Sequence, residues 1–458
     1  MPADTIKPQS GWRELWTKED WWATWIGLAI VLVACALFWS GGSLRWLAVV
    51  PPRWTDFREV IEDLAANWLR YIGLYLLWLA AFSLGLAVMG QRVRAFVPAF
   101  TLLYLAAYAI FVIGQWQEAS SYNLEPPLLA LLIGLLIANT VRLPSWFEAG
   151  LKTEFYVKTG IVLLGATLPL SLVVQAGPVA MLQAAIVSIV TFSVIYTVAV
   201  QFGLERRFAA TLGVGGAACG VSAAIAVAGA VGGKKEDTAV VITIVVIWAV
   251  IMVFALPLVA RALGLPTGVA GAWIGTSEFA DAAGFAAAQT YGGYAGKVPG
   301  IAGTADQALT AFTLMKVVGR DMWIGVWAVG LAIVATTRWE AHPGGSAPDA
   351  GEIWRRFPKF VIGLFIASAI ITLATAHYSL EEYNSIVSPA LTNPLKDLRT
   401  WAFIFCFFSI GLKTRFRDLA SAGRTPFSAF TTGVVVNVIL GFILSVYVFG
   451  GYWAALGQ

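Results

Sequence analysis

Long runs of apolar residues alternate with short polar segments along most of the 458-residue chain. About thirteen of these runs approach the length, roughly 20 residues, that an α-helix needs to cross the hydrocarbon core of a bilayer. They centre on residues 21–41, 66–90, 95–115, 127–141, 157–175, 179–203, 210–231, 238–262, 270–290, 307–335, 358–377, 397–412 and 427–449. The pattern predicts an all-α polytopic membrane protein.

Composition supports this class and excludes several others. Hydrophobic residues make up 59% of the chain and charged residues only 12%, against about 25% charged in a soluble domain. A soluble enzyme, a disordered chain, a nucleic-acid binder and a disulfide-rich secreted scaffold are therefore excluded. The three cysteines lie inside apolar runs, and His342 and His377 are the only histidines. No metal site and no cofactor are expected.

Lys and Arg are more abundant in the loops on the side of the membrane that holds the N-terminus. The positive-inside rule then places the N-terminus in the cytoplasm. Four blocks are predicted along the chain: an N-terminal extension of three spans (1–120), a first transporter block (121–335), a polar cytoplasmic linker rich in Pro and Gly (336–357) and a C-terminal block (358–458). The aromatic extension is expected to pack on lipid or on a partner subunit, with a homodimer left open.

The two large blocks share a weak internal sequence repeat. Leu164–Thr167 followed by Ala176-Gly177 is similar to Ile410–Lys413 followed by Ala422-Gly423, at the same offset for both pairs of motifs. An odd number of predicted spans separates the copies, so their orientations in the membrane are opposite. This is the pattern of an inverted-topology repeat, with chance similarity in Gly- and Ala-rich sequence as the alternative.

The first segment that could carry chemistry is Gly213–Ser222, which holds glycines at 213, 215, 216 and 220. Such a run either allows close helix packing or unwinds a helix in mid-membrane. Unwinding would expose backbone N–H groups at a half-helix N-terminus, where an anion is favoured. The candidate substrate-facing residues are Gly215, Gly216, Cys219, Gly220 and Ser222.

A second segment, Gly275–Gly284, holds two carboxylates within an apolar run. Glu278 and Asp281 share one face if the segment is helical, and they are candidates to bind a coupling proton or Na⁺. A position of Glu278 near the lipid headgroups is the alternative. Thr276 and Ser277 would either offer hydroxyls to a substrate or cap a half-helix.

In a third segment, Lys316 and Arg320 lie four residues apart and far inside a predicted span. Buried cations need counter-charges, which either the nearby acids or an anionic substrate would supply. The first alternative is purely structural. The second makes both residues part of an anion-selective site.

These segments resemble the bacterial sulfate exporter family of conserved membrane proteins over residues 125–425, roughly. The likeness lies in Gly134–Thr140, Lys158–Thr167, the run 216–224, Trp273–Thr276, Lys316 and Ser409–Leu412. It implies two inverted repeats, two broken helices that cross in mid-membrane, a bacterial inner-membrane location and export of a small sulfur oxyanion. Many relatives have a His-acid pair where this chain has Phe279-Ala280, which disfavours coupling through a histidine.

Two hypotheses follow. The first is a secondary active transporter, an exporter of a small anion such as sulfate or sulfite, coupled to H⁺ or Na⁺. The alternative is a cation/proton antiporter or a Na⁺-coupled organic anion carrier, in which Lys316 or Arg320 neutralises helix C-termini. An intramembrane enzyme is disfavoured, because these segments lack a Ser/His or multi-carboxylate metal arrangement.

Overall fold

The computed structural model describes residues 13–118, 126–167, 170–339, 358–379, 382–415 and 423–456. Within these residues the secondary structure is helical, apart from one isolated β-bridge between Trp54 and Trp116. Seven described helices are long and apolar enough to span a membrane: Glu19–Trp39, Phe57–Val88, Val93–Gly114, Gly177–Gln201, Glu236–Ala262, Ala305–Trp339 and Arg424–Val448. The predicted all-α membrane class is confirmed, whereas the count of thirteen spans remains a prediction.

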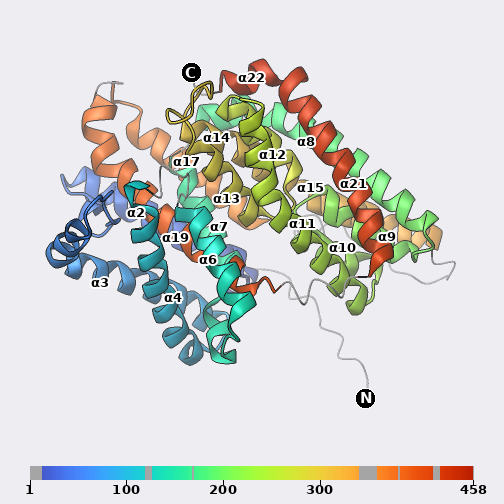
Figure 1. The fold of residues 1–458 in the computed structure, drawn as a ribbon, viewed down its shortest axis with the longest axis horizontal. Coiled ribbons are helices and arrows are strands. Elements are labelled where there is room, and N and C mark those ends of the chain that lie inside the picture. The colour runs from blue at the N-terminus through green and yellow to red at the C-terminus, as the bar shows by residue number, and fades with distance from the viewer. Residues whose placement is uncertain are drawn as a thin grey trace. The chain divides into compact units, whose positions relative to one another are not determined.

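Two compact units make up the chain, and each is assembled from separated segments (Figure 1). The first unit comprises Met1–Gln117, Arg142–Leu170 and Lys359–Ser409, and the second comprises Glu118–Val141, Ser171–Pro358 and Ile410–Gln458. This grouping differs from the consecutive blocks expected from the sequence. Most of the predicted linker, residues 340–357, lies outside the described residues.

The first unit is built around three helices that pack against one another, α2 (Glu19–Trp39), α7 (Thr153–Gly165) and α17 (Lys359–Thr375). Its other elements are α1 (Glu14–Thr17), η1 (Leu44–Trp46), α3 (Phe57–Val88), α4 (Val93–Gly114), η2 (Ser145–Gly150), η5 (Tyr383–Thr392) and α19 (Asn393–Lys413). Glycine allows the close approach of the three helices, since Gly165 abuts the backbone carbonyl of Leu364 in α17.

Ion pairs and a hydrogen bond connect these three helices near their N-termini. Lys158 on α7 forms ion pairs with Asp20 at 2.9 Å and with Glu19 at 3.3 Å, both in the first turn of α2. The second carboxylate oxygen of Asp20 accepts the backbone N–H of Lys359, where α17 begins. The carboxylates lie at a helix N-terminus, where negative charge is stabilised.

An aromatic core joins the N-terminal helices to later parts of the first unit. Trp78 of α3 contacts Phe405 of α19 edge-on, and the rings of Tyr104 and Trp401 stack with centroids 5.1 Å apart. Trp78 and Trp401 are fully buried. The three predicted N-terminal spans are present as α2, α3 and α4, and their buried sides share a core with α7, α17 and α19, while α3 keeps an exposed apolar side.

The second unit contains two helices that are interrupted in the middle. Its elements are α6 (Pro126–Thr140), α8 (Leu170–Gln201), α9 (Arg206–Ala217), α10 (Val221–Val231), α11 (Lys235–Ala262), α12 (Thr267–Ser277), α13 (Asp281–Gly292), α14 (Ala305–Thr313), η3 (Leu314–Arg320), α15 (Trp323–Val334), η4 (Ala335–Trp339), α21 (Arg424–Phe442), η6 (Ile443–Val448) and α22 (Gly450–Ala454). The pairs α9/α10 and α12/α13 are the interrupted helices, and α14 packs against both α12 and α13.

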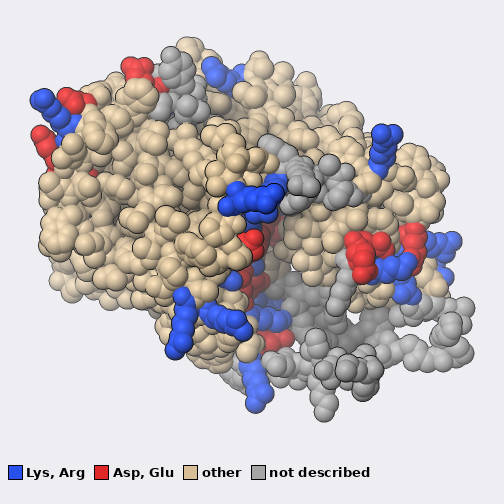
Figure 2. All heavy atoms as spheres, turned by 60° about the horizontal axis from the view of Figure 1, so that its bottom comes forward, with Lys and Arg blue, Asp and Glu red and all other residues tan. Residues whose placement is uncertain are grey.

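Charged side chains are sparse on the molecular surface. Figure 2 shows a face that is largely free of Lys, Arg, Asp and Glu over broad areas. Large apolar side chains such as Trp68, Leu69 and Leu76 of α3 are exposed. In water such a surface would aggregate, whereas in a bilayer it contacts lipid.

The contact between Gly165 and Leu364 predicts a stability effect. A Cβ added at Gly165 would come within 2.3 Å of the Leu364 carbonyl oxygen, so Gly165→Ala is expected to destabilise the protein by about 1–3 kcal/mol. The matched change Gly330→Ala, in α15, meets no atom within 4 Å and is expected to be neutral or slightly stabilising. Thermal loss of the monodisperse peak in detergent measures both, and equal midpoints for the two variants would contradict the packing argument.

Candidate functional site

The first interruption follows from a glycine that adopts a conformation other residues avoid. Helix α9 ends at Ala217, Ala218 has φ −125° and ψ −128°, and Gly220 has φ +68° before α10 begins at Val221. Without a Cβ, glycine reaches positive φ at little cost. The Gly-rich run thus breaks a helix, as one of the two alternatives predicted.

The second interruption lies between Ser277 and Asp281. Glu278 and Ala280 are extended, with ψ values of 135° and 129°, and α13 begins at Asp281. Glu278 therefore lies in the link, and Asp281 lies in the helix that follows it. The two carboxylates do not share one helical face, because no continuous helix joins them.

The two interruptions touch each other. A Cβ at Gly220 would lie 2.6 Å from the carbonyl oxygen of Phe279 and 2.7 Å from the Val245 side chain on α11. Only a residue without a side chain allows this approach. The link of α9/α10 thus packs directly on the link of α12/α13.

Lys316 and Arg320 project from η3 into this contact, and both are fully buried. The Lys316 ammonium donates to the carbonyl oxygens of Ala218, Glu278 and Phe279 at 3.0–3.3 Å. The Arg320 guanidinium donates to those of Gly216, Thr276 and Glu278.

These carbonyls belong to the ends of α9 and α12. The last carbonyls of a helix lack intrahelical partners and carry about half a negative charge. The two cations satisfy them, as the alternative hypothesis predicted for such residues. The segment η3 is a π-helix, a local widening of the helix that is frequent at functional sites.

Three carboxylates accompany the two cations. Asp281 lies 3.5 Å from the Lys316 ammonium, with its side chain 11% exposed. Glu278 is fully buried, and its Oε1 accepts the backbone N–H groups of Phe279 and Ala280. Asp321, also buried, interacts electrostatically with Arg320. With all five groups ionised, two positive charges face three negative charges.

The two half-helices that begin at the site differ in charge. Helix α13 has Asp281 in its first turn and Glu278 on the N–H groups before it. Helix α10 has no acidic residue in its first turn and no side-chain cap. Ser222, in that first turn, is exposed. The partial positive charge of the α10 N-terminus is thus not neutralised by a side chain of its own first turn.

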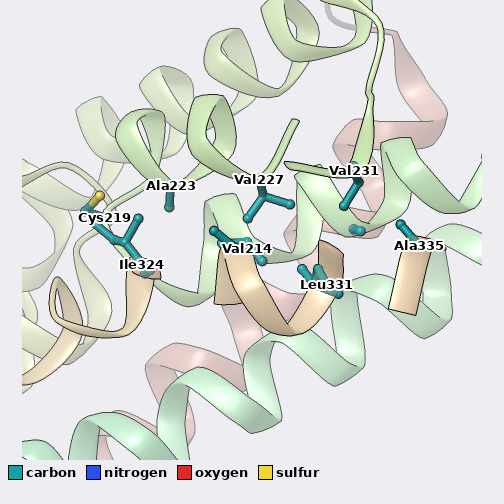
Figure 3. Packing of buried hydrophobic residues seen from close by; sticks show 11 residues of the cluster. Val214, Cys219, Ala223, Val227, Val231, Ile324, Leu331 and Ala335 are labelled. Atoms are coloured by element: carbon teal, nitrogen blue, oxygen red, sulfur yellow. The ribbon is translucent and has the colours of Figure 1, made fainter. Parts of the chain in front are cut away.

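The remaining predicted residues have mainly packing roles. Gly215 faces Val241 and Val245, and Gly216 faces Ile195 and Phe430, as the close-packing alternative predicted for this run. Figure 3 shows Cys219 beside Ile324 in the hydrophobic cluster that joins α9, α10 and α15.

The two predicted hydroxyl residues also differ. The Thr276 hydroxyl donates to the carbonyl of Trp273, one turn earlier in α12. The Ser277 hydroxyl is buried without a partner among the described residues and lies beside Gly441 of α21. Ser277 therefore retains its hydroxyl donor, whereas the Thr276 donor is used within α12.

Sequence reasoning expected Lys316 or Arg320 at helix C-termini only under the alternative hypothesis, and it did not identify which carbonyls they bind. A signal was available, because each predicted break ends a half-helix, and helix C-termini attract cations. It also missed Phe279, whose ring lies 5.9 Å from the Arg320 guanidinium carbon. Within the described ranges no group of three or more His, Cys, Asp or Glu is placed to hold a metal ion.

Comparison with known proteins identifies the family. The sequence profile of the family described as Conserved hypothetical protein 698 matches residues 98–429. The chain belongs to this family. Proteins similar to it are described as UPF0324 membrane proteins. That of Rhodopirellula baltica (RB9488) is 28% identical, over 96% of this chain and 91% of its own length.

Two further members of the family match over different lengths. The Nitrosomonas europaea protein (NE0724) is 30% identical over 92% of this chain and 94% of its own length. A Nitratidesulfovibrio vulgaris protein is 31% identical over 80% of this chain, which spans 62% of that relative. No solved structure matches the chain.

The contact between the links predicts the effect of Gly220→Ala. This change combines an unfavourable positive φ with a collision at the Phe279 carbonyl, whereas Gly264→Ala has the positive φ of +60° without any atom within 4 Å. Gly220→Ala is expected to cost about 1–3 kcal/mol more than Gly264→Ala. Thermal midpoints in detergent test this, and a larger loss for Gly264→Ala would exclude close packing of the links.

Removal of the Arg320 charge is expected to destabilise the unit. Arg320→Met removes the side-chain donor from the Gly216 and Thr276 carbonyls, while the Glu278 carbonyl keeps its bond from Lys316, for an expected loss of about 3–5 kcal/mol. The control is Arg207→Met, which removes an exposed arginine from the Gly232 carbonyl at the end of α10, with an expected loss below about 1 kcal/mol. Equal thermal shifts in the two variants would show that Arg320 does not hold the links.

Proposed function

We propose that the chain is an ion-coupled secondary transporter of a small anion, with its site where the two broken helices meet. The observation that carries the proposal is the difference between the two half-helix N-termini. Neither helix has a side-chain cap, but α10 begins without an acidic residue in its first turn, whereas α13 begins with Asp281 and follows a link in which Glu278 accepts two backbone N–H groups. The N-terminus of α10 favours an anion, and the N-terminus of α13 favours a proton or a cation.

The anion is assigned to the beginning of α10. The first N–H groups of a helix have no intrahelical partners, and their partial positive charge attracts anions. The exposed Ser222 adds a hydroxyl to the same turn. The C-terminal carbonyls of α9 and α12, which would repel an anion, are covered by Lys316 and Arg320. The cations thus favour anion binding through the backbone, without a direct contact to the substrate.

Charge balance supplies the coupling. Three carboxylates outweigh two cations when all are ionised, so an arriving anion meets a cluster that is already negative. Neutralisation of Glu278 and Asp281 by H⁺ or Na⁺ reverses that sign. Binding of the anion and of the coupling ion therefore favour each other, which is the thermodynamic condition for coupled transport.

The proposal includes an inverted-repeat fold, from which alternating access would follow. Gly165 ends α7 against the Leu364 carbonyl, and Gly411, near the end of α19, lies against the Leu131 carbonyl of α6. Thr191 and Asn437 are hydrogen-bonded and 246 residues apart, the same offset that separates Gly165 from Gly411. A residue that contacts its own equivalent lies near a two-fold axis.

Two further parts of the proposal rest on the sequence: about thirteen membrane elements from hydropathy and a cytoplasmic N-terminus from the positive-inside rule. Location in the bacterial inner membrane and export of sulfate or sulfite, without a catalytic step or a cofactor, rest on the resemblance given above. The first measurements use these two anions because the α10 N-terminus supplies N–H donors and a hydroxyl, which match oxyanions.

A cation/proton antiporter is the second candidate. It is favoured by one observation: Lys316 and Arg320 are fully buried and hydrogen-bonded to carbonyls, so they offer no charge directly to an anion. Asp281 would then bind the transported cation. Cation flux in the absence of any permeant anion distinguishes this candidate from the first.

Reconstitution in liposomes tests the transport proposal. Sulfate or sulfite efflux is expected to rise at least about tenfold when a proton or Na⁺ gradient is imposed, and Asp281→Asn is expected to abolish the gradient dependence because it removes the accessible carboxylate. Asp306→Asn, an exposed acid in the first turn of α14, is the control and should leave efflux unchanged. Gradient-dependent flux that survives Asp281→Asn would remove this residue from the coupling site.

A further inference from the structure

Glu278 has one carboxylate oxygen that the surrounding protein does not satisfy. Its Oε1 accepts the backbone N–H groups of Phe279 at 2.9 Å and Ala280 at 3.2 Å. Its Oε2 is buried and has no hydrogen-bond partner among the described residues. A buried ionised oxygen without a partner costs far more than the hydroxyl of a neutral carboxylic acid in the same place.

Apolar groups pack against the stem of this side chain. Its Cγ lies so close to Gly284 of α13 that an added Cβ would come within 3.0 Å, and the Phe312 ring of α14 lies against the same position. These neighbours provide no oxygen ligands. Hard cations are bound by several oxygens at once, so the pocket suits a proton better than Na⁺.

Charged and titratable groups face Glu278 from three other elements. Lys316 and Arg320 of η3 both donate to its main-chain carbonyl, and the ion pair of Lys316 is with the Asp281 carboxylate. Asp321 follows η3, and Cys219 belongs to the neighbouring link. The two cations are thus engaged with backbone oxygens and with Asp281.

We propose that the coupling ion is a proton, carried on Oε2 of Glu278, and that Asp281 is the accessible carboxylate that balances the charge of Lys316. Glu278 is fully enclosed, whereas the Asp281 side chain is 11% exposed. The step is the ionisation of one O–H bond: the proton leaves Oε2 for water when the link between α12 and α13 opens, and Oε1 keeps its two N–H donors. The transport role rests on the proposed function, whereas the protonated state does not.

Infrared spectroscopy of the purified full-length protein in liposomes tests the assignment without any substrate. The wild type is expected to show a protonated-carboxyl C=O band at neutral pH that titrates away at alkaline pH. The band should be lost in Glu278→Gln and retained in Asp281→Asn and in the control Asp306→Asn. Glu278→Gln is expected to fold, because the amide oxygen can still accept the two N–H groups.

Three results would overturn the proposal: absence of the band from the wild type at neutral pH, its persistence in Glu278→Gln, or its loss when Na⁺ is added at constant pH. The first and third need no variant, so they decide the matter even if Glu278→Gln does not fold. Loss of the band at alkaline pH together with its insensitivity to Na⁺ would support a proton site.

Flux measurements separate this proposal from the proposed function. Glu278→Gln is expected to lower pH-gradient-driven anion efflux at least tenfold. A titrating band that depends on Glu278, in protein that transports neither sulfate nor sulfite, would keep the proton site and reject the proposed transport. Gradient-driven efflux that is unchanged in Glu278→Gln would reject the coupling role of Glu278.

Discussion

The hydrogen bonds from Lys316 and Arg320 to the carbonyls at the ends of α9 and α12 are the interaction on which the site depends. A helix that stops inside a membrane leaves carbonyls that no water can satisfy, and each such group costs several kcal/mol. Two buried cations on a single π-helical segment meet carbonyls from both broken helices at once. The cations compensate for the breaks, and the breaks in turn provide the cations with a polar environment.

This arrangement explains which parts of the site could be predicted from the sequence. The first interruption was predictable, because glycines inside a span either break the helix or allow close packing. The second, whose link holds no glycine, was implied by the resemblance. The alternative hypothesis placed the cations at helix C-termini, but their spacing could not identify which carbonyls they bind. The expectation that Glu278 and Asp281 share a helical face failed because the segment between them is extended, and periodicity arguments assume a continuous helix.

Tertiary grouping was the least predictable feature. Hydropathy locates spans one by one, and consecutive spans were assigned to consecutive blocks. In the first unit, Asp20, Lys158 and Lys359 come from three distant parts of the chain and meet at the beginnings of three helices. The aromatic residues of α3 and α4 likewise pack on α19. Neither set of contacts has a local sequence signal. A Trp in a span, for example, packs equally well on lipid or on a neighbouring helix.

The distribution of charge around the links also constrains any mechanism in which they move. If the two links separate, Lys316 and Arg320 each lose their bonds to the carbonyls of one of the two helices, and the loss of a hydrogen bond between buried groups is unfavourable. Opening therefore requires a replacement partner, either water at the open side or an anion near α10. Because Glu278 contributes a main-chain acceptor to both cations and a carboxyl group to the N–H groups of the same link, any movement of that link changes the environment of its carboxyl group. In the proposed transporter, substrate binding, helix separation and protonation would be linked through this one residue.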